Sequence, residues 1–405
     1  MHQDAAAIWI AAINAVDPER LVPHRLPLET IGRIVVIGAG KAAAGLAAGV
    51  EALLGTTGRE RSRVTGLVSV PAGCGRILKA IEVRETRPSA ANLPTPAVVE
   101  ATREMLSMLG SLEPDDLAIA LITGGGSALL AAPKSGISLD EKIAVTRQLS
   151  ESGADIATLN AARRRLSLVK GGGLARACTA GNLLVLVLSD VLGNDLDVIA
   201  SGPCMPPEPT VPPGQWVTPG GCRVQHLLIG DNATAVAAAV AAARQRGYEI
   251  VPAGDTRETS AEAVGHRLAA DAVAILAEVH RDGRPRALIT GGEATVQVPV
   301  DHGRGGRNQQ TVLAAIDAIE RAGTAWPEGL LVASVGTDGE DGPTDAAGAY
   351  ADDTVVAAIA RQQLDLHRAL ARCDAYPLFA AAGGLIHTGP TGTNVADIRI
   401  VLARP

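Results

Sequence analysis

The string Leu-Ile-Thr-Gly-Gly occurs twice in this chain of 405 residues, at 121–125 and at 288–292. Each copy closes an apolar run, LAIALITGG in the first case and RALITGG in the second. An apolar run that stops at glycines is typical of a buried parallel strand that delivers the chain to a tight, ligand-facing turn. The chemistry that follows differs, GGGS in one copy and GGEAT in the other. We therefore expect two α/β lobes whose strand ends open on one cleft.

Alternating strand and helix patterns in the first half of the chain predict a parallel sheet with crossover helices. The expected strands are 33–37, 64–70, 117–122 and 183–188, and the expected helices are 41–54, 96–109, 139–151 and 160–177. Residues 203–221 hold seven prolines and few apolar side chains. Prolines at this density favour irregular structure, so we expect a linker between domains there.

The second half of the chain has a different pattern. The expected strands are 226–230, 249–252, 287–290, 295–300, 330–335 and 398–402, with a helix over 233–246. The segment ATVQVPV alternates apolar and polar residues, which is typical of a strand with one exposed face. We therefore expect an antiparallel element in this lobe, which makes it a mixed α/β lobe.

The composition argues against several classes of function. The formal net charge is −7, the isoelectric point is near 5.7 and aromatic residues make up 2%, whereas nucleic acids and anionic membranes require clustered basic side chains. The five cysteines are scattered and form no C-x-x-C pair, so neither a disulfide framework nor a zinc site is indicated. The sequence has no apolar run of about 18 residues and no basic signal region at its start. We expect a cytoplasmic protein with no nucleic-acid and no membrane partner.

The first glycine turn, in VVIGAGKAAA, fits the loose dinucleotide-binding pattern through Gly38, Gly40 and Ala43. The acidic residue that an NAD site needs after the second strand is missing, because that strand ends in Ser-Val-Pro. Lys41 lies in the first turn of the next helix, where a positive charge is unfavourable unless an anion binds there. We therefore interpret Lys41 as a ligand of phosphate or carboxylate; the alternative is an exposed helix lysine.

Two further candidates follow strands of the first lobe. Gly124, Gly125, Gly126 and Ser127 can form a nest of backbone amides for an anion; the alternative is a tight turn with an ordinary serine cap. Asp190 directly follows the apolar run LLVLVL. Its carboxylate is therefore expected at the carboxyl end of a strand, where an active-site cleft would lie.

The second half adds basic and acidic candidates. The segment GRGGRNQQ places Arg304 and Arg307 in a glycine-rich loop, and a guanidinium there can bind a carboxylate or phosphoryl group at two points. Glu293 and Asp338 each follow an apolar strand. Carboxylates beside basic groups are what a magnesium-nucleotide site requires. We expect Mg²⁺ to be held by Asp190, Glu293 and Asp338; surface Asp-Gly turns are the alternative for the acids at 338–345.

Nine motifs occur in a fixed order along the chain: GAGKA, LITGGGSALL, LVKGGGLA, SDVLGND, VIASGP, TGGEATV, GRGGRNQ, GTDGEDGPTDAAGA and TGPTGTNVAD. This ordered set, from about residue 5 to residue 402, resembles the glycerate 2-kinase family. Its members carry a C-terminal MOFRL domain and are also named hydroxypyruvate reductases. Each motif alone is modest evidence, whereas the ordered set is specific.

The resemblance implies a two-lobed α/β protein, with a Rossmann-like domain over 1–222, a MOFRL domain over 223–405 and the active site in the interlobe cleft. It implies transfer of the γ-phosphoryl group of ATP to the 2-hydroxyl of D-glycerate, giving 2-phosphoglycerate, with Mg²⁺. Glycerate and ATP are the expected partners, and a homodimer is left open. The catalytic residues it implies are Lys41, Arg307 and Asp190, and the binding residues are Gly38, Gly40, Gly124, Gly125, Gly126, Ser127, Glu293, Asn308 and Asp338.

The chain departs from the family pattern at RPSAANLP in 87–94, at RRRLSLV in 163–169 and at Gln310. These departures bear on the acceptor and leave the expected fold unchanged. Three alternatives stay open: a kinase for another small hydroxy acid, an NAD(P)H-dependent hydroxypyruvate reductase, and a non-catalytic sensor of sugar acids. Which glycine turn binds the nucleotide and which binds the acceptor is open as well.

Overall fold

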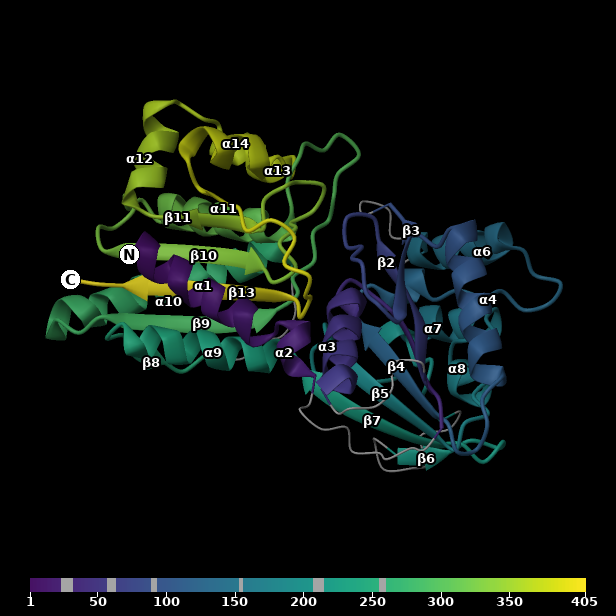
Figure 1. Ribbon diagram of the computed structural model, residues 1–405. Helices are drawn as coiled ribbons and strands as arrows, with labels where there is room; N and C mark the ends of the chain where they lie inside the picture. The colour runs from purple at the N-terminus through teal and green to yellow at the C-terminus, as the bar shows by residue number, and fades with distance from the viewer. Residues whose placement is uncertain (23–31, 57–62, 89–92, 153–155, 207–214, 255–259) are drawn as a thin grey trace. The chain divides into compact units, whose positions relative to one another are not determined.

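The computed structural model describes residues 1–22, 32–56, 63–88, 93–152, 156–206, 215–254 and 260–405 (Figure 1). The chain divides into two compact units, each with its own sheet. The parallel-sheet unit comprises residues 17–231 and 392–394, and the mixed-sheet unit comprises residues 1–16, 232–391 and 395–405. The predicted pair of α/β lobes, one with a parallel sheet and one mixed, is confirmed.

The sheet of the parallel-sheet unit has the strand order β3-β2-β1-β4-β5-β7-β6 among the described residues (Figure 1). Its strands are β1 (Ile34–Ala39), β2 (Val64–Pro71), β3 (Ile81–Arg87), β4 (Leu117–Thr123), β5 (Asn182–Leu188), β6 (Gln215–Val217) and β7 (Arg223–Gly230). Neighbouring strands run parallel, except that β6 is antiparallel to β7. Strands β1 and β4 are buried at every residue, which explains their continuous apolar sequence, since both faces of such strands are covered.

The strand order reverses at β1, which lies between β2 and β4. From β1 the chain builds outward through β2 and β3, and it then returns to build β4 and β5 on the other side. Open parallel sheets bind ligands outside the carboxyl ends of the strands at such a reversal. Ala39 of β1 lies beside Ile122 of β4 in the register. The glycine turns that follow these two strands are therefore neighbours at the expected ligand edge.

Helices connect the strands of this unit. They are α2 (Pro18–Leu21), α3 (Ala43–Thr56), α4 (Pro96–Gly110), α5 (Gly126–Leu129), α6 (Leu139–Glu151), α7 (Ile156–Arg165), α8 (Gly173–Arg176) and the 3₁₀ turn η2 (Ile199–Ser201). α4 begins as its sequence predicts, because the hydroxyl of Thr95 accepts the N–H of Val98 and Pro96 occupies the first turn.

The mixed-sheet unit has the strand order β12-β11-β10-β13-β9-β8 among the described residues. Its strands are β8 (Glu249–Val251), β9 (Arg286–Gly292), β10 (Leu330–Gly336), β11 (Gly348–Ala351), β12 (Leu385–Ile386) and β13 (Asp397–Ala403). Its helices are α1 (His2–Ala15), α9 (Asn232–Gln245), α10 (Ala261–Asp282), α11 (Arg307–Arg321), α12 (Asp353–Arg361), α13 (Leu366–Ala371) and α14 (Ala375–Ala382). Only β8 and β9 pair in parallel in this described sheet, so the expected antiparallel character is present.

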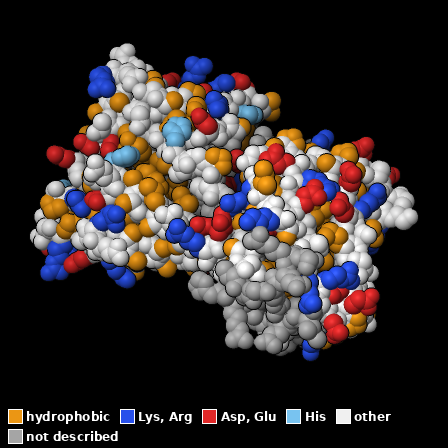
Figure 2. Space-filling model, in the orientation of Figure 1, with side chains coloured by type: hydrophobic (Ala, Val, Ile, Leu, Met, Phe, Trp, Pro, Cys, Tyr) orange, Lys and Arg blue, Asp and Glu red, His pale blue; other side chains and the backbone are white. Residues whose placement is uncertain are grey.

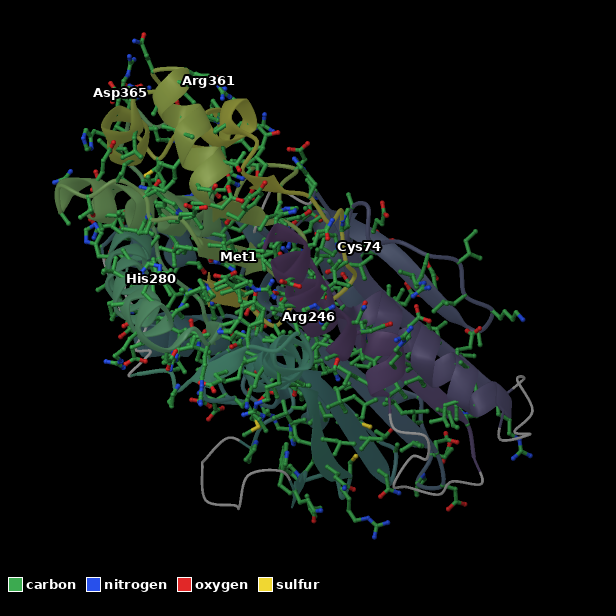
Figure 3. The ribbon with its side chains drawn as sticks, turned by 90° about the vertical axis from the view of Figure 1, so that its left-hand side faces the viewer. Met1, Cys74, Arg246, His280, Arg361 and Asp365 are labelled. Carbon is green, nitrogen blue, oxygen red and sulfur yellow. The ribbon has the colours of Figure 1, made fainter. Side chains whose placement is uncertain are left out.

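The first helix of the chain belongs to the mixed-sheet unit. α1 packs against α9, and α10 packs against α11. The carboxylate of Asp4 accepts a hydrogen bond from the hydroxyl of Tyr248 at 3.0 Å and forms an ion pair with the guanidinium of Arg404 at 2.9 Å. Figure 3 shows Met1, at the start of α1, and Arg246, just after α9, on the same side of this unit, and Arg246 lies 3.9 Å from Asp4. These contacts attach α1 to β13 and to the end of α9.

Several sequence predictions differ from the structure. The predicted domains 1–222 and 223–405 differ from the structural units in three places, because β7 completes the parallel sheet, α1 joins the mixed-sheet unit and residues 392–394 belong to the parallel-sheet unit. The predicted linker 203–221 contains β6, which pairs with β7, and its residues 207–214 lie outside the described residues. The predicted helix 160–177 is wrong as a single element, because α7 ends at Arg165 and α8 starts at Gly173.

The predicted strand 295–300 is also wrong. Thr295 makes an isolated bridge to Ser260, and the residues after it form no strand. Val298 and Val300 are exposed, so this segment alternates without a neighbouring strand that could pair with it. The antiparallel element of this unit is supplied instead by β10, β11 and β13.

Charge is mixed over the surface that Figure 2 shows. Lys and Arg side chains are interspersed with Asp and Glu side chains on both units, with no continuous basic area on the face in view (Figure 2). Among the described residues, no helix combines the length and apolar character needed to cross a bilayer. All five cysteines are free thiols.

Candidate active site

The structure joins two of the predicted glycine turns. The backbone N–H of Lys41 donates to the carbonyl of Gly124 at 2.9 Å, and the N–H of Ala42 donates to the hydroxyl of Thr123 at 3.2 Å. Gly40 has a φ of +136°, and a Cβ there would lie 2.0 Å from the Thr123 hydroxyl oxygen. Only glycine permits both that backbone conformation and the close approach. The turn after β1 is thus held against the turn after β4.

Asp190 lies over the second of these turns. A Cβ on Gly124 would be 2.3 Å from Oδ2 of Asp190 and 2.6 Å from Nδ2 of Asn394. The amide of Asn394 donates to the same carboxylate oxygen at 3.4 Å. The missing side chain of Gly124 therefore lets a carboxylate approach the backbone at the carboxyl end of β4. Asn394 lies in the motif TGPTGTNVAD but was not predicted as a site residue.

A second cation lies beside Lys41. A Cβ on Gly125 would be 3.6 Å from Cγ of Lys41 and 3.7 Å from Nη2 of Arg87. Arg87 ends β3 and is 4% exposed, and its Nη1 donates to the carbonyl of Pro88. The structure therefore brings two basic side chains to the Gly125 backbone, one predicted and one missed. The only signal for Arg87 in the sequence was its place at the start of a segment that departs from the family pattern.

Ser127 does not cap a helix. The N-cap of α5 is Gly125, in a left-handed conformation, with no side-chain cap bond. The hydroxyl of Ser127 instead lies 3.3 Å from the hydroxyl of Ser201 in η2. The serine-cap alternative is therefore wrong.

In the mixed-sheet unit, Arg307 is held by two carboxylates. Its Nε and Nη2 donate to the two oxygens of Asp397, at 2.7 and 2.9 Å, and its Nη1 lies 2.9 Å from the carboxylate of Glu293. Burial alone lowers the pKa of Arg307, but the carboxylates of Asp397, Glu293 and Asp338 outweigh it and raise the pKa. The two-point contact fixes the plane of the guanidinium. Asp397 begins β13 and was missed by the sequence analysis.

Asn308 and Asp341 support the start of α11. The Asp341 carboxylate accepts the backbone N–H groups of Asn308 and Gln309, at 2.9 and 2.8 Å. It thereby caps a helix whose N-cap residue, Gly306, has no side chain. The side-chain amide of Asn308 donates to Asp397 at 3.0 Å and accepts from the Ser334 hydroxyl at 2.5 Å. Asn308, expected to bind a ligand, is thus buried and orients the partner of Arg307.

The ionisation of Asp341 is perturbed. Burial raises the pKa of Asp341 to about 6, and the nearby charge of Asp397 raises it too, whereas the two backbone N–H groups and Arg307 lower it. This buried carboxyl therefore titrates close to neutrality. A surface Asp-Gly turn was the alternative for the acids at 338–345, and for Asp341 that alternative is wrong because the side chain is 1% exposed.

Several carboxylates surround Arg307. Glu293, Asp338 and Asp397 all act on this one guanidinium. Arg304, also predicted in this loop, places its guanidinium 4.2 Å from the ring of Tyr376. Among the described residues, no three histidine, cysteine or acidic side chains are placed to hold a metal ion by themselves.

The predicted site residues fall into two groups. Gly38, Gly40, Lys41, Gly124, Gly125, Gly126, Ser127 and Asp190 lie in the parallel-sheet unit, and Glu293, Arg307, Asn308 and Asp338 lie in the mixed-sheet unit. Gly38 lies within β1 and Arg307 and Asn308 begin α11, whereas Lys41 and Asp190 lie at the glycine turns and Glu293 and Asp338 act on Arg307. The predicted meeting of Lys41 with Arg307 joins residues of different units and stays a prediction, as does the shared metal set of Asp190, Glu293 and Asp338.

Comparison with known proteins gives consistent matches along the chain. Residues 4–213 match a domain of unknown function, DUF4147, and residues 286–397 match the MOFRL family. A D-glycerate 2-kinase of Thermotoga maritima is 34% identical over 96% of this chain and 95% of its own length. A protein of Agrobacterium vitis, named provisionally as a hydroxypyruvate reductase, is 36% identical over 92% of this chain and 100% of its own. The crystal structure of a glycerate kinase from Thermotoga maritima superposes with a TM-score of 0.83 at 31% identity, over 99% of both chains.

Proposed function

This chain belongs to the glycerate 2-kinase family, and on that premise we propose that it transfers the γ-phosphoryl group of ATP to the 2-hydroxyl of D-glycerate. The products are 2-phosphoglycerate and ADP. The observation that best supports this is the meeting of Lys41, Arg87 and Asp190 around the glycine turn after β4. Phosphoryl transfer requires cations around the moving group and a carboxylate to orient the attacking hydroxyl.

In the parallel-sheet unit, the two cations and the turn have distinct roles. Lys41 and Arg87 lie beside Gly125, where they neutralise phosphate oxygens as negative charge develops on them. The carboxylate of Asp190 accepts the proton of the acceptor hydroxyl while the new O–P bond forms and the bond to the ADP oxygen breaks. Asn394 donates to Asp190 and thereby holds this carboxylate in place beside the glycine turn.

In the mixed-sheet unit, Arg307 supplies a further oriented cation. Asp397 is 1% exposed and accepts hydrogen bonds from two N–H groups of Arg307. The plane of the Arg307 guanidinium is therefore fixed before the substrate binds. Glu293 is 46% exposed and is the partner that a phosphate oxygen replaces at Nη1. We propose that residues of both units take part in the same reaction, as the sequence analysis predicted.

The carboxylates around Arg307 fit a divalent cation in the donor atoms they offer. Mg²⁺ binds through one or two carboxylates together with phosphate oxygens, so a complete protein cage is not needed. The carboxylates of Glu293 and Asp338, which both act on Arg307, support this proposal, and Asp190 is the candidate in the other unit. When bound, Mg²⁺ would neutralise charge on the phosphate chain.

The test is a coupled ADP-release assay over a panel of three- and four-carbon hydroxy acids, with the product phosphate located by NMR. D-glycerate is expected to be the best acceptor. Lys41→Ala and Arg307→Ala should each lower turnover about a hundredfold or more. Lys79→Ala and Arg361→Ala are the matched controls, since Lys79 is exposed and Arg361 lies at the end of α12 (Figure 3). Near-normal turnover in a folded Lys41 or Arg307 variant would remove that residue from the mechanism.

The alternative activity is reduction of hydroxypyruvate by NAD(P)H, favoured by the pattern of Gly38, Gly40 and Ala43. In the structure, β2 pairs with β1 and ends at Ser69, Val70 and Pro71, so its end offers no acid for a ribose hydroxyl. Oxidation of NADH in the presence of hydroxypyruvate, at a rate above that of ADP release with glycerate, would establish this alternative.

We also propose a cytoplasmic location, which the free thiols support. The homodimer stays a prediction.

A further inference from the structure

Three basic side chains lie close together behind the Ser127 turn. Lys142 projects from α6 and is 5% exposed, Arg163 projects from α7, and Lys170 follows α7 and is 2% exposed. Burial lowers the pKa of Lys142, and the charge of Arg163 lowers it further. Burial also lowers the pKa of Lys170, and both neighbouring cations add to this effect. The charge of Arg163 therefore acts on both lysines, and the charge of Lys142 acts on Lys170.

No described carboxylate compensates this charge. Within the part of the chain that the structure describes, Lys142, Arg163 and Lys170 have no ion-pair partner. Lys170 donates to the carbonyl of Ala200 at 2.8 Å, and Arg163 donates to the side chain of Asn160 at 3.3 Å. Both acceptors are neutral. Buried cations without a counter-charge are costly, and an anion bound beside them would offset that cost.

A cavity opens between two of these cations. It has a volume of about 70 Å³ and is lined by Ser127, Lys142, Thr146 and Arg163, with Leu93 and Ile143 on its apolar side. A single water needs roughly 10–15 Å³ of such volume. The cavity therefore has room for several waters or for the carboxylate end of a three-carbon acid, and it is too small for an adenine nucleotide.

Hydrogen bonds connect the cavity to the turn that carries the reaction. Ser127 contacts the hydroxyl of Ser201, Ser201 donates to Asn160, and Arg163 donates to the same amide oxygen. Ala200 and Ser201 have φ of +50° and +62°, which is unfavourable for residues with a side chain and is found mainly at functional sites. Ser127 itself follows Gly124 to Gly126, where Asp190 and Lys41 lie.

We propose that the cavity between Ser127, Lys142 and Arg163 binds a small oxyanion group of a substrate. Its chemistry suits a carboxylate or a phosphoryl group, and its size favours the carboxylate of the hydroxy-acid acceptor. The assignment of this group to the acceptor rests on the proposed kinase function. The Ser127 end of the glycine turn then binds the acceptor, and the Lys41 and Arg87 side binds the phosphates.

The test combines kinetics with ligand-dependent stability. Lys142→Met and Arg163→Met remove one charge each and keep an apolar stem, and Arg147→Met, on the exposed side of α6, is the matched control. If the cavity binds the acceptor, KM for D-glycerate rises at least about tenfold while KM for ATP stays within twofold. If it binds a phosphate of the nucleotide, KM for ATP rises instead. Both values within twofold of the Arg147→Met control would overturn the proposal.

A second readout needs no activity. The thermal midpoint of the wild-type protein is measured alone, with D-glycerate and with inorganic phosphate. One of the two anions should raise it, and Lys142→Met should lose most of that rise while melting no lower than wild type without ligand, because a repulsive charge is gone. A merely structural lysine would lower the midpoint of the unliganded variant and leave the ligand effect intact, which refutes the proposal. If the protein shows this ligand effect but has no kinase activity, the proposed function is rejected and the anion-binding cavity is not.

Discussion

Replacing Gly124 with alanine tests whether the position of Asp190 governs turnover. The added Cβ would lie 2.3 Å from Oδ2 of Asp190, whereas ordinary contact begins at 3.4 Å, so the carboxylate must retreat by about 1 Å. Misplacement of a reacting group by about 1 Å costs on the order of a hundredfold in rate. Overpacking at one methyl costs about 1–3 kcal/mol in the free energy of unfolding. The variant should therefore stay folded and lose turnover.

The assay compares kcat from coupled ADP release with the free energy of unfolding from urea titration. Gly110→Ala is the matched control, because a Cβ there meets only the carbonyl oxygen of Ala177, at 3.8 Å. It should keep kcat within a factor of about two and be as stable as wild type or slightly more so, since alanine favours the helical state over glycine. A Gly124→Ala variant that retains more than about a third of wild-type kcat would refute the role given to Asp190.

Two further predictions concern the mixed-sheet unit. Arg307→Ala should lose about 3–5 kcal/mol in the free energy of unfolding, because it leaves the buried carboxylate of Asp397 without its partner. Arg307→Lys keeps the charge and should lose about 1–2 kcal/mol. Equal losses for the two variants in urea titration would contradict this prediction. The pKa of Asp341 is raised to about 6 from 3.8, so the folded state binds this proton more tightly than the unfolded state does. The free energy of unfolding should therefore fall by up to about 3 kcal/mol as the pH rises from about 4 to about 6, and it should change little above pH 6. Asp341→Asn should remove that slope, and an unchanged pH profile between pH 4.5 and 7.5 would show that another group causes it.

The sequence predicted the buried strands better than the edge strands. β1, β4 and β5 were found because strands covered on both faces are continuous apolar runs. β3 was missed because it lies at the sheet edge and carries charged residues in IEVRETR. The false strand at 295–300 has the right alternation, but β13 and β8 already occupy both edges of β9. Alternation of apolar and polar residues indicates which side chains are exposed. A strand also needs a neighbouring strand to pair with, and the whole fold determines which strands are neighbours.

The site was predicted where a chemically distinct residue follows a buried strand, as with Lys41 and Asp190. The residues that were missed reach the site from elsewhere in the fold. Arg87 ends the edge strand that was overlooked, and Asn394 comes from a loop about 200 residues after Asp190. The sequence could have indicated Asp397, because this carboxylate begins the apolar run DIRIVLA. A carboxylate buried with such a strand needs a positively charged partner. Its partner, Arg307, lies 90 residues away, a separation that no local pattern specifies.

The assignment of α1 to the mixed-sheet unit makes a final prediction, and it opposes the predicted domain 1–222. Asp4 joins α1 to Tyr248 and Arg404, whereas Asp17, thirteen positions later, caps α2 in the other unit by accepting the N–H of Glu19. Asp4→Ala should cost about 1–2 kcal/mol and speed hydrogen exchange in α1 and at the end of β13. Asp17→Ala should cost a similar amount through its lost cap, yet change exchange only around α2. If Asp4→Ala instead speeds exchange in α2 and α3 and leaves β13 protected, the first helix belongs with the parallel sheet.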